Sequence, residues 1–333
     1  MKEKILVTGA KGRLGGKVVQ KLLSKGYSVR VVDRDTEGLW EKFGKFLKRK
    51  RIEIVQLDLL NPDERKISAI CEGIDFVIHL AALIDYSASE KDLININAIA
   101  TGRLAHLAKK AGAKGIVFAS STSVTRKPRY LPIDENHPYS PQNAYGRSKL
   151  MAEHFVKHSG LDYAILRMSI IYGAGFEEGF SQVVKAVKRG KMKIIGKGVN
   201  RISFVHVDDA VNAFLLALNG LEKQKFRNEI FIITGKPFTQ LECYTEIARQ
   251  LKVKPPEEHV SKFLAYLMAF VEEKKAALYG RKPRMAREYV HTLAEDRYFD
   301  TSKAEEMLGW RQKVSFPEGL KRFIKSIRGR WNG

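Results

Sequence analysis

The chain of 333 residues lacks most features that mark a secreted or membrane-spanning protein. It has only two cysteines, Cys71 and Cys243, which lie far apart and outside any Cys-x-x-Cys pattern. Two such thiols build no disulfide framework and favour a reducing, cytoplasmic location. The apolar run Ile5–Val7 is too short for a signal peptide. The longest apolar run near the C-terminus, Phe263–Val271, has nine residues, whereas a transmembrane helix needs about 20.

Other absences exclude whole classes of protein. There is no long single-residue tract, no Ser/Pro-rich linker and no repeat with a period of about 20–50 residues, so disorder and solenoid folds are not expected. No hydrolase elbow with a nucleophilic serine is present. His154 and His158 are four residues apart, but the Glu of H-E-x-x-H and a third ligand are missing. We therefore predict no metal site.

Acidic residues are also scarce relative to basic ones. The chain has 37 Asp and Glu against 59 Lys and Arg, which gives a net charge of +22. Such a charge fits a nucleic acid, an anionic lipid surface, anionic substrates or the Lys-rich surface of a thermophile protein. The basic residues are spread along the chain without a nucleic-acid motif. We predict no nucleic-acid partner. The basic surface is expected either to be solvated or to be attracted to a membrane.

The first half of the chain alternates short apolar runs with amphipathic helical patterns. Strands are predicted over Ile5–Val7, Val29–Val32, Ile52–Leu57, Phe76–Leu80, Ile116–Ala119 and Tyr163–Met168. The stripe Val18, Val19, Leu22 and Leu23 predicts a helix that Gly26 ends, and further helices are predicted over Ile99–Ala111 and Lys149–His158. Apolar strands separated by helices indicate a parallel sheet covered on both faces.

After residue 170 helices dominate, with strand-like segments at Ile202–Val207 and Glu229–Ile233. We expect an α/β fold, a Rossmann-type doubly wound parallel sheet with a smaller, mostly helical C-terminal lobe. The predicted domains are a dinucleotide-binding domain over residues 1–168 and a substrate-binding lobe over 169–333. Residues 202–235 are expected to return to the Rossmann sheet.

A glycine-rich loop follows the first strand, and its residues are Gly9, Gly12, Arg13, Leu14 and Gly15. The glycines have the spacing G-x-x-G-x-x-G between a strand and a helix. A tight turn of this kind lets backbone N–H groups approach a pyrophosphate at the positive end of a helix. The loop therefore predicts a dinucleotide cofactor.

The ends of the next strands supply further cofactor candidates. Asp33 lies where a carboxylate accepts hydrogen bonds from the adenosine ribose, which favours NAD. Arg34 or Arg30 could clamp a 2′-phosphate instead, so NADP stays possible. Asp58 either faces the adenine or caps a helix, and His79 is expected to be a packed core residue. The remaining candidates follow the third and fourth strands: Leu59, Leu80, Ala81 and Ala82.

Tyr145 is the only one of the 12 tyrosines that has a lysine, Lys149, four residues later. Together with TGAKGRLG, VVDRD, LDLL, HLAA, FASSTSV and FVHVDDA, the segment YGRSK resembles the extended short-chain dehydrogenases/reductases. This resemblance covers nearly the whole chain. The extended family includes the NAD-dependent epimerases and dehydratases. Within it, the chain most resembles the 3β-hydroxysteroid dehydrogenase and dihydroflavonol reductase groups.

The resemblance implies a Ser-Tyr-Lys catalytic set. Tyr145 would be the acid/base and Lys149 its electrostatic support, both also touching the cofactor. Ser121 would hold the substrate oxygen, with Ser120 and Ser123 as alternatives. Asn97 matches an asparagine behind the site. Two departures from the family pattern are Ala100 in place of glycine and Met168 in place of proline.

The implied reaction is hydride transfer at a hydroxyl or ketone carbon of a small hydrophobic molecule, with a nucleotide-sugar 4-epimerase or dehydratase as the alternative. Nucleotide-sugar members usually carry an asparagine where this chain has Ile170. Substrate contacts are expected from Ile84, Tyr86, Ser123 and Ile170. We also expect a homodimer with no transmembrane segment. The sequence is compatible with peripheral contact to a membrane.

Overall fold

The computed structural model describes residues 2–47, 51–60, 63–85, 88–176, 180–281, 283 and 287–327. Its centre is a seven-stranded parallel sheet in the order β11-β6-β5-β4-β1-β2-β3. These strands are β1 (Lys4–Thr8), β2 (Ser28–Asp33), β3 (Ile52–Gln56), β4 (Phe76–His79), β5 (Gly115–Ser121), β6 (Asp162–Met168) and β11 (Glu229–Ile233). The topology confirms the predicted Rossmann-type fold. The strand order reverses between β1 and β4, which leaves a crevice at the carboxyl ends of the strands.

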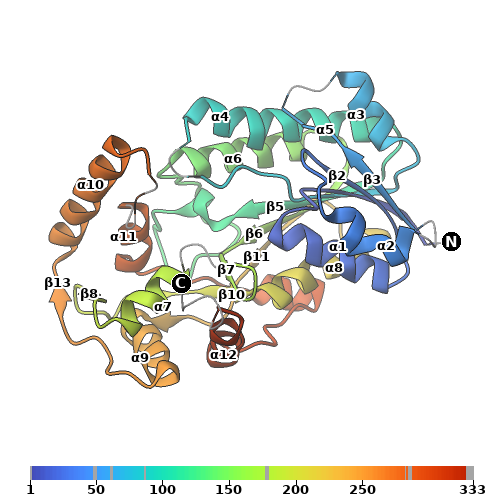
Figure 1. Ribbon diagram of the computed structural model, residues 1–333. Coiled ribbons are helices and arrows are strands. Elements are labelled where there is room, and N and C mark those ends of the chain that lie inside the picture. Colours follow the sequence, from blue (N-terminus) through green and yellow to red (C-terminus); the bar gives the residue numbers. More distant parts are fainter. Residues whose placement is uncertain are drawn as a thin grey trace.

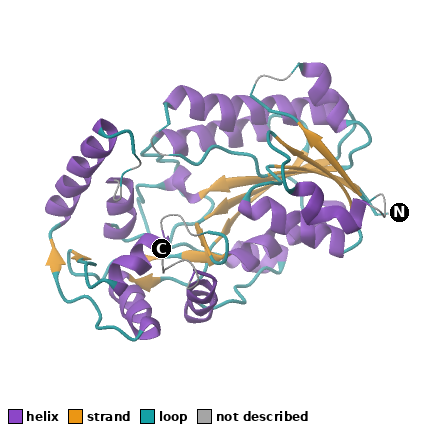
Figure 2. Ribbon diagram, in the orientation of Figure 1, coloured by secondary structure: helices purple, strands orange, loops and turns teal. Residues whose placement is uncertain are grey.

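Helices cover both faces of this sheet, as its apolar strands require (Figure 2). One face carries α1 (Arg13–Ser24), α2 (Leu39–Leu47) and α8 (Val207–Glu222) (Figure 1). The other carries α3 (Glu64–Cys71), α5 (Ala100–Lys110) and α6 (Ala144–Lys157) (Figure 1). Each face has its own apolar core, with Leu22 and Phe214 in the first and Leu104 and Val156 in the second.

Two helices begin earlier than their apolar patterns predicted. α4 (Glu90–Ile94), the π-helical turn η1 (Asn95–Ile99) and α5 follow one another without a break. α6 begins at Ala144 rather than Lys149, because the Asn143 side chain accepts the Gly146 N–H at 2.7 Å and caps the helix. The cap extends the helix by a polar first turn that apolar periodicity does not detect.

The other elements gather beyond the carboxyl ends of the main strands, around two smaller cores (Figure 1). One contains Tyr172, Phe180 and Phe204, and the other contains Ala265, Ala269 and Val290. These elements are β7 (Ile170–Tyr172), α7 (Phe180–Lys188), β8 (Ile194–Ile195), β9 (Arg201–Ile202), β10 (Phe204–His206), β12 (Phe238–Thr239), α9 (Gln240–Leu251), β13 (His259–Val260), α10 (Lys262–Leu278), α11 (Arg287–Ala294) and α12 (Phe316–Ile327). Two short turns complete the chain: η2 (Thr122–Thr125) and η3 (Ala304–Leu308). Within the described ranges, no helix has the length and hydropathy that a membrane crossing demands.

The strands between residues 202 and 235 do not all return to the main sheet, contrary to our expectation. β11 does, because it pairs with β6. β10 pairs instead with β7, and β9 pairs with β12, in separate two-stranded sheets. β7 begins two residues after β6 ends, and the chain leaves the main sheet there. The apolar pattern indicates a strand at this position, but strand pairing is a non-local contact that the pattern does not specify.

Candidate active site

A cavity of about 1870 Å3 runs along the carboxyl ends of the main strands and continues towards the C-terminal elements. Every described residue that was predicted to bind cofactor or substrate lines it. These residues are Gly9, Gly12, Arg13, Leu14, Gly15, Asp33, Arg34, Asp58, Leu59, Leu80, Ala81, Ala82, Ile84, Ser121, Ser123, Tyr145, Lys149 and Ile170. Tyr86 lies outside the described residues.

The glycine loop packs so closely that side chains are excluded. Gly9 has φ +71°, and a Cβ there would lie 2.7 Å from the backbone nitrogen of Ala81. A Cβ on Gly15 would overlap the carbonyl oxygen of Gly9. Gly12 caps α1 without a side-chain hydrogen bond, and the first turn of α1 has no acidic residue. The positive end of α1 is therefore open to an anion, and this cradle fits the pyrophosphate of a dinucleotide.

Asp33 is held against the glycine loop by a backbone hydrogen bond. Its carboxylate Oδ2 accepts the backbone N–H of Lys11 at 2.9 Å. Arg30 cannot serve as the alternative phosphate ligand, because it is buried and its guanidinium donates to Glu53 and to three backbone carbonyls, including that of Ile70 at 2.8 Å. Arg34 lines the cavity and is the candidate that stays available for a 2′-phosphate.

The structure also decides between the two interpretations of Asp58. Its Oδ1 accepts the N–H of Leu60 at 3.0 Å, within the loop that follows β3. The cap of α3 is Asp63, whose side chain accepts the N–H of Arg65. Asp58 is therefore not a helix cap and lines the cavity instead.

Tyr145 and Lys149 both belong to α6, and their spacing places them on one face of that helix. Tyr145 is 7% exposed and Lys149 is 3% exposed. The ammonium of Lys149 donates to the carbonyl of Ala119 at 2.7 Å and lies 4.8 Å from the centre of the Phe118 ring. Burial lowers the pKa of Lys149 to about 7, an effect that the nearby Glu153 carboxylate opposes.

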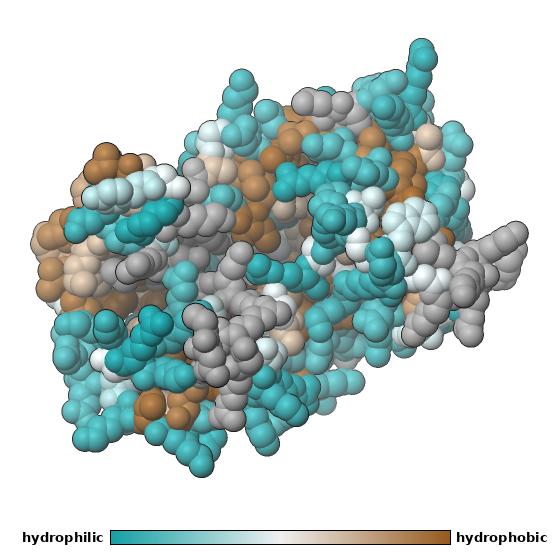
Figure 3. Space-filling model, in the orientation of Figure 1, coloured by the Kyte–Doolittle hydropathy of each residue, from teal (hydrophilic) through white to brown (hydrophobic). Residues whose placement is uncertain are grey.

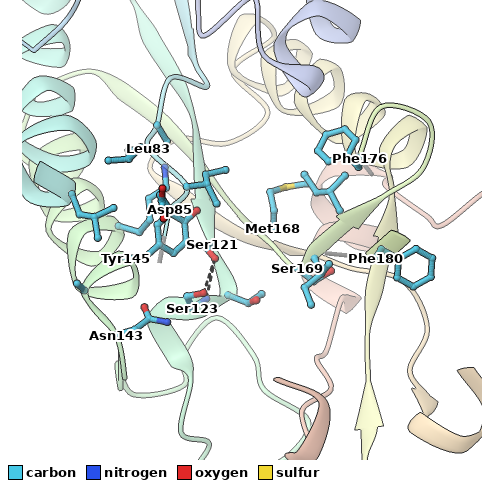
Figure 4. A pocket seen from close by; sticks show the side chains of 18 of the residues that line it. Leu83, Asp85, Ser121, Ser123, Asn143, Tyr145, Met168, Ser169, Phe176 and Phe180 are labelled. Carbon is cyan, nitrogen blue, oxygen red and sulfur yellow. Dashed lines mark hydrogen bonds between the residues drawn. The ribbon is translucent and has the colours of Figure 1, made fainter. Parts of the chain in front are cut away.

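Strand alternation separates the serines at the end of β5. Ser120 is buried, and its hydroxyl donates to Glu153 at 2.6 Å. The next side chain, Ser121, points to the cavity and donates to the hydroxyl of Ser123 at 3.1 Å, as Figure 4 shows. Ser121 and Ser123 therefore share the open side of the strand end, whereas Ser120 also lines the cavity but has its hydroxyl bonded to Glu153.

Behind these side chains, His79 is a satisfied core residue, as predicted. Its two ring nitrogens bond the hydroxyls of Thr8 at 2.6 Å and Thr101 at 2.8 Å. Thr101 also donates to the carbonyl of Asn97, so the His79 ring donates from Nε2 and accepts at Nδ1. Burial, assisted by the charge of Lys149, lowers the pKa of His79 to about 3. The imidazole is neutral and structural.

Asn97 connects the segment after β4 to the start of α6. Its side chain accepts the N–H of Leu83 at 2.7 Å and donates to the Leu83 carbonyl at 3.0 Å. It also donates to the hydroxyl of Ser148 at 3.0 Å, and Ser148 donates to the carbonyl of Tyr145 at 2.8 Å. The asparagine therefore holds two walls of the cavity together. The π-helical turn η1 provides its position, and such turns are frequent at functional sites.

Several cavity residues escaped the sequence analysis. They are Arg126, Asn143 and Arg297. Asn143 had a recognisable signal, an Asn directly before a helix. Arg297 had none, because it reaches the cavity only through tertiary contact and donates to the carbonyl of Thr122, 175 residues earlier, at 2.9 Å.

The two sides of the cavity differ in chemistry (Figure 4). Tyr145, Ser121 and Asn143 lie on the polar side. Met168, Phe176 and Phe180 lie on the opposite, largely apolar side, with Ser169 between them. Ile170, two residues after Met168, also lines the cavity. Ile170 is 43% exposed despite its place in a strand. Among the residues described by the structure, no group of three or more His, Cys, Asp or Glu is arranged to hold a metal.

Comparisons with known proteins agree with this geometry. The model of the "NAD dependent epimerase/dehydratase family" matches residues 5–233. A protein of Methanocaldococcus jannaschii with the provisional name UDP-glucose 4-epimerase is 32% identical over 97% of this chain and 98% of its own. The sterol-4-alpha-carboxylate 3-dehydrogenase (decarboxylating) of Mus musculus is 26% identical over 98% and 91%. The UDP-glucuronic acid 4-epimerase of Bacillus cereus, solved in complex with NAD, shares the fold with a TM-score of 0.75, at 22% identity over 98% and 99% of the two chains.

Proposed function

The chain belongs to the NAD dependent epimerase/dehydratase family, and within it we propose an NAD-dependent dehydrogenase or reductase that acts on a hydroxyl or ketone carbon of a small hydrophobic molecule, steroid-like or lipid-like in character. The family is NAD-dependent, in agreement with the predicted cofactor. In this proposal residues 1–168 bind the cofactor, and residues 169–333 supply much of the substrate side of the cavity.

In this proposal the glycine loop, the first turn of α1 and Asp33 bind the dinucleotide and fix its orientation. The backbone of the loop from Gly9 to Gly15 and the positive end of α1 hold the pyrophosphate. Asp33 accepts hydrogen bonds from the adenosine ribose hydroxyls. Bound NAD supplies the nicotinamide carbon that accepts or returns the hydride.

Tyr145 moves the proton of the reacting hydroxyl or ketone oxygen, and Ser121 donates a hydrogen bond to that oxygen. A free tyrosine has a pKa near 10, so deprotonation near neutral pH requires about 4 kcal/mol of stabilisation. One positive charge at about 4 Å supplies about 4 kcal/mol at an effective dielectric of about 20. Lys149 provides this charge when it is protonated.

Burial opposes that protonation, because it lowers the pKa of Lys149 to about 7. The attraction acts on both partners, however. A tyrosinate at Tyr145 stabilises the ammonium of Lys149 by the same free energy with which the ammonium stabilises the tyrosinate. The proposal therefore treats the two groups as one coupled pair whose titration belongs to the pair.

The observation that carries the choice of substrate is the apolar side of the cavity. Met168, Phe176 and Phe180 face the side that bears Tyr145 and Ser121 (Figure 4). Ile170, two residues after Met168, also lines the cavity. Ile170 takes the place at which nucleotide-sugar members of the family usually present an asparagine. An exposed isoleucine gains free energy when an apolar ligand covers it and offers nothing to a sugar diphosphate.

A nucleotide-sugar 4-epimerase or dehydratase is the second candidate. It is favoured by the identity to the Methanocaldococcus jannaschii protein. It is also favoured by two lysines in the cavity lining, Lys191 and Lys193, that could face a diphosphate. In this case the cofactor is reoxidised within each turnover and no net redox change occurs.

The test is incubation of the purified protein with NAD or NADP and a panel of sterols, hydroxyketones and UDP-sugars. Net formation of reduced nicotinamide with a sterol or hydroxyketone, read from its absorbance, supports the dehydrogenase. Sugar interconversion without net reduction of the cofactor contradicts it and supports the epimerase.

A tyrosine variant tests the assigned roles. Tyr145→Phe should abolish turnover and leave NAD affinity within about threefold. The matched control is Tyr130→Phe, which removes a hydroxyl that is exposed and bonded to Asp134; it should keep turnover. Full activity in Tyr145→Phe would show that the proton is moved by another group.

A further inference from the structure

The helix α10 buries its small side chains and exposes its large apolar ones. Ala265, Ala269 and Ala276 are at most 3% exposed and form its inner face. On the opposite face, at helical spacing, lie larger side chains with these exposed fractions: Phe263 78%, Leu264 47%, Leu267 44%, Val271 42% and Leu278 80%. In Figure 3 apolar surface gathers at the end of the molecule that α10 forms. We call these five side chains the α10 apolar face.

The charges around this face are positive. Both acidic residues of α10 are paired with arginines: Glu272 with Arg281 at 2.7 Å, and Glu273 with Arg287 at 2.6 Å. The exposed cations of the helix are its lysines, Lys262, Lys274 and Lys275. An apolar helical face with lysines beside it is the pattern of helices that lie in the interface of a membrane.

We propose that α10 docks on an anionic phospholipid membrane. The α10 apolar face enters the boundary between headgroups and acyl chains, and Lys274 and Lys275, which lie on and beside that face, contact the acidic headgroups. Charge favours this occupant over a second copy of the chain, because two copies would bring like-charged lysines together and each copy carries a net charge of +22. The docking does not depend on which substrate is turned over.

The helix α10 also forms part of the cavity wall, so docking of α10 would bring the cavity close to the membrane. Tyr266, Met268 and Ala277 of α10 line the cavity on the flanks of the same helix. A membrane against α10 therefore lies next to one edge of the cavity. A lipid-like ligand would have a short path from the bilayer to the apolar side of the site.

The test is co-sedimentation of the full chain with vesicles. We expect binding to vesicles of equal parts phosphatidylcholine and phosphatidylglycerol at low salt, and a loss of at least about tenfold with phosphatidylcholine alone or at high salt. The double variant Phe263→Ser with Leu267→Ser should lower the partition coefficient at least about tenfold. The control Trp40→Ser removes an aromatic side chain that is 52% exposed on α2 and should leave binding unchanged.

The lysines are tested separately. The double variant Lys274→Glu with Lys275→Glu should lower binding by about 25-fold or more, since each lysine contributes about fivefold at an anionic surface. Lys109→Glu with Lys110→Glu makes the same change at two consecutive lysines that end α5 and should lower binding much less. Equal losses in both pairs would show a diffuse charge effect and overturn the proposal.

Two further results would also overturn it. One is wild-type protein that stays in the supernatant with the phosphatidylglycerol vesicles. The other is a wild-type oligomer that the Phe263/Leu267 double variant dissociates in the absence of vesicles, which would make this face an interface between copies. Variants are compared only where their thermal unfolding midpoints equal that of the wild type within a few degrees.

Discussion

Glu153 and Arg167 form an ion pair in the interior, with 2.9 Å between Oε2 and Nη2, and the side chains are 0% and 1% exposed respectively. The pair joins α6 to β6. Glu153 also accepts from Ser120, the neighbour of Ser121, and it lies four residues after Lys149 on α6. A buried ion pair therefore fixes the position of α6 relative to β6, directly behind the polar side of the cavity.

Removal of one partner of this pair should be costly. Glu153→Gln leaves the guanidinium of Arg167 buried without its counter-charge, and we expect the free energy of unfolding to fall by about 3–5 kcal/mol. The double variant Glu153→Leu with Arg167→Met should recover most of this loss. Denaturant unfolding measures both. The exposed pair of Glu90 and Arg147 is the control, and Glu90→Gln should change stability far less. Equal effects at the two sites would contradict the prediction.

The glycine loop should not tolerate a methyl group at Gly15. A Cβ there overlaps the carbonyl of Gly9, so Gly15→Ala should lower NAD affinity at least about 100-fold and remove the rise in melting temperature that NAD causes. Gly44→Ala is the matched change in α2, where a Cβ meets nothing within 4 Å. That variant should gain about 0.5–1 kcal/mol of stability and bind NAD normally. Normal NAD binding by Gly15→Ala would place the pyrophosphate elsewhere.

Asp33 should set the preference between the two cofactors. Asp33→Ser removes the carboxylate that repels a 2′-phosphate and leaves Arg34 in the cavity lining. We expect the ratio of NAD to NADP affinity to fall at least about tenfold, measured by titration of the two reduced cofactors. Asp35→Ser removes the same charge two residues later and should change the ratio less. A ratio unchanged in Asp33→Ser would remove Asp33 from the adenosine site.

His79 should make the fold sensitive to acid. Its pKa is about 3 in the folded protein and 6.5 as a free side chain. Between these values the unfolded chain binds more protons than the folded protein. The contribution of neutral His79 to the free energy of unfolding is therefore complete above pH 6.5 and is lost as the pH falls towards 3. Wild-type protein should lose about 3 kcal/mol more than His79→Gln between about pH 7 and about pH 4. If the free energy of unfolding falls by the same amount in both proteins across this pH range, His79 does not make this contribution.

Much of the fold was predictable because its signals are local. Each main-sheet strand from Ile5–Val7 to Glu229–Ile233 was identified by an apolar run, and the glycine loop by its spacing between a strand and a helix. The same local signals assign the candidate residues to the carboxyl ends of the strands, where the cavity lies, since parallel strands present these ends together.

The missed cap at Asn143, and with it the early start of α6, is a local feature. The other errors and omissions concern non-local contacts. Apolar alternation identified a strand near residue 204 but not its pairing with β7. No sequence pattern could show that Arg30 is tied to the carbonyls near Ile70, or that Arg297 reaches Thr122. The apolar run Phe263–Val271 is visible in the sequence, but which face of α10 is buried depends on the elements that pack against it.

The sequence by itself therefore determined the architecture, the cofactor loop and the Tyr145–Lys149 pair, because each rests on spacing along one element or its immediate neighbours. Only the tertiary structure decided the environment of those residues. It bonded the hydroxyl of Ser120 to Glu153 and turned that of Ser121 to the cavity, buried Lys149 so that its pKa is lowered to about 7, and turned the large side chains of α10 outward. Burial and long-range hydrogen bonding are properties of the packed chain, and no local pattern records them.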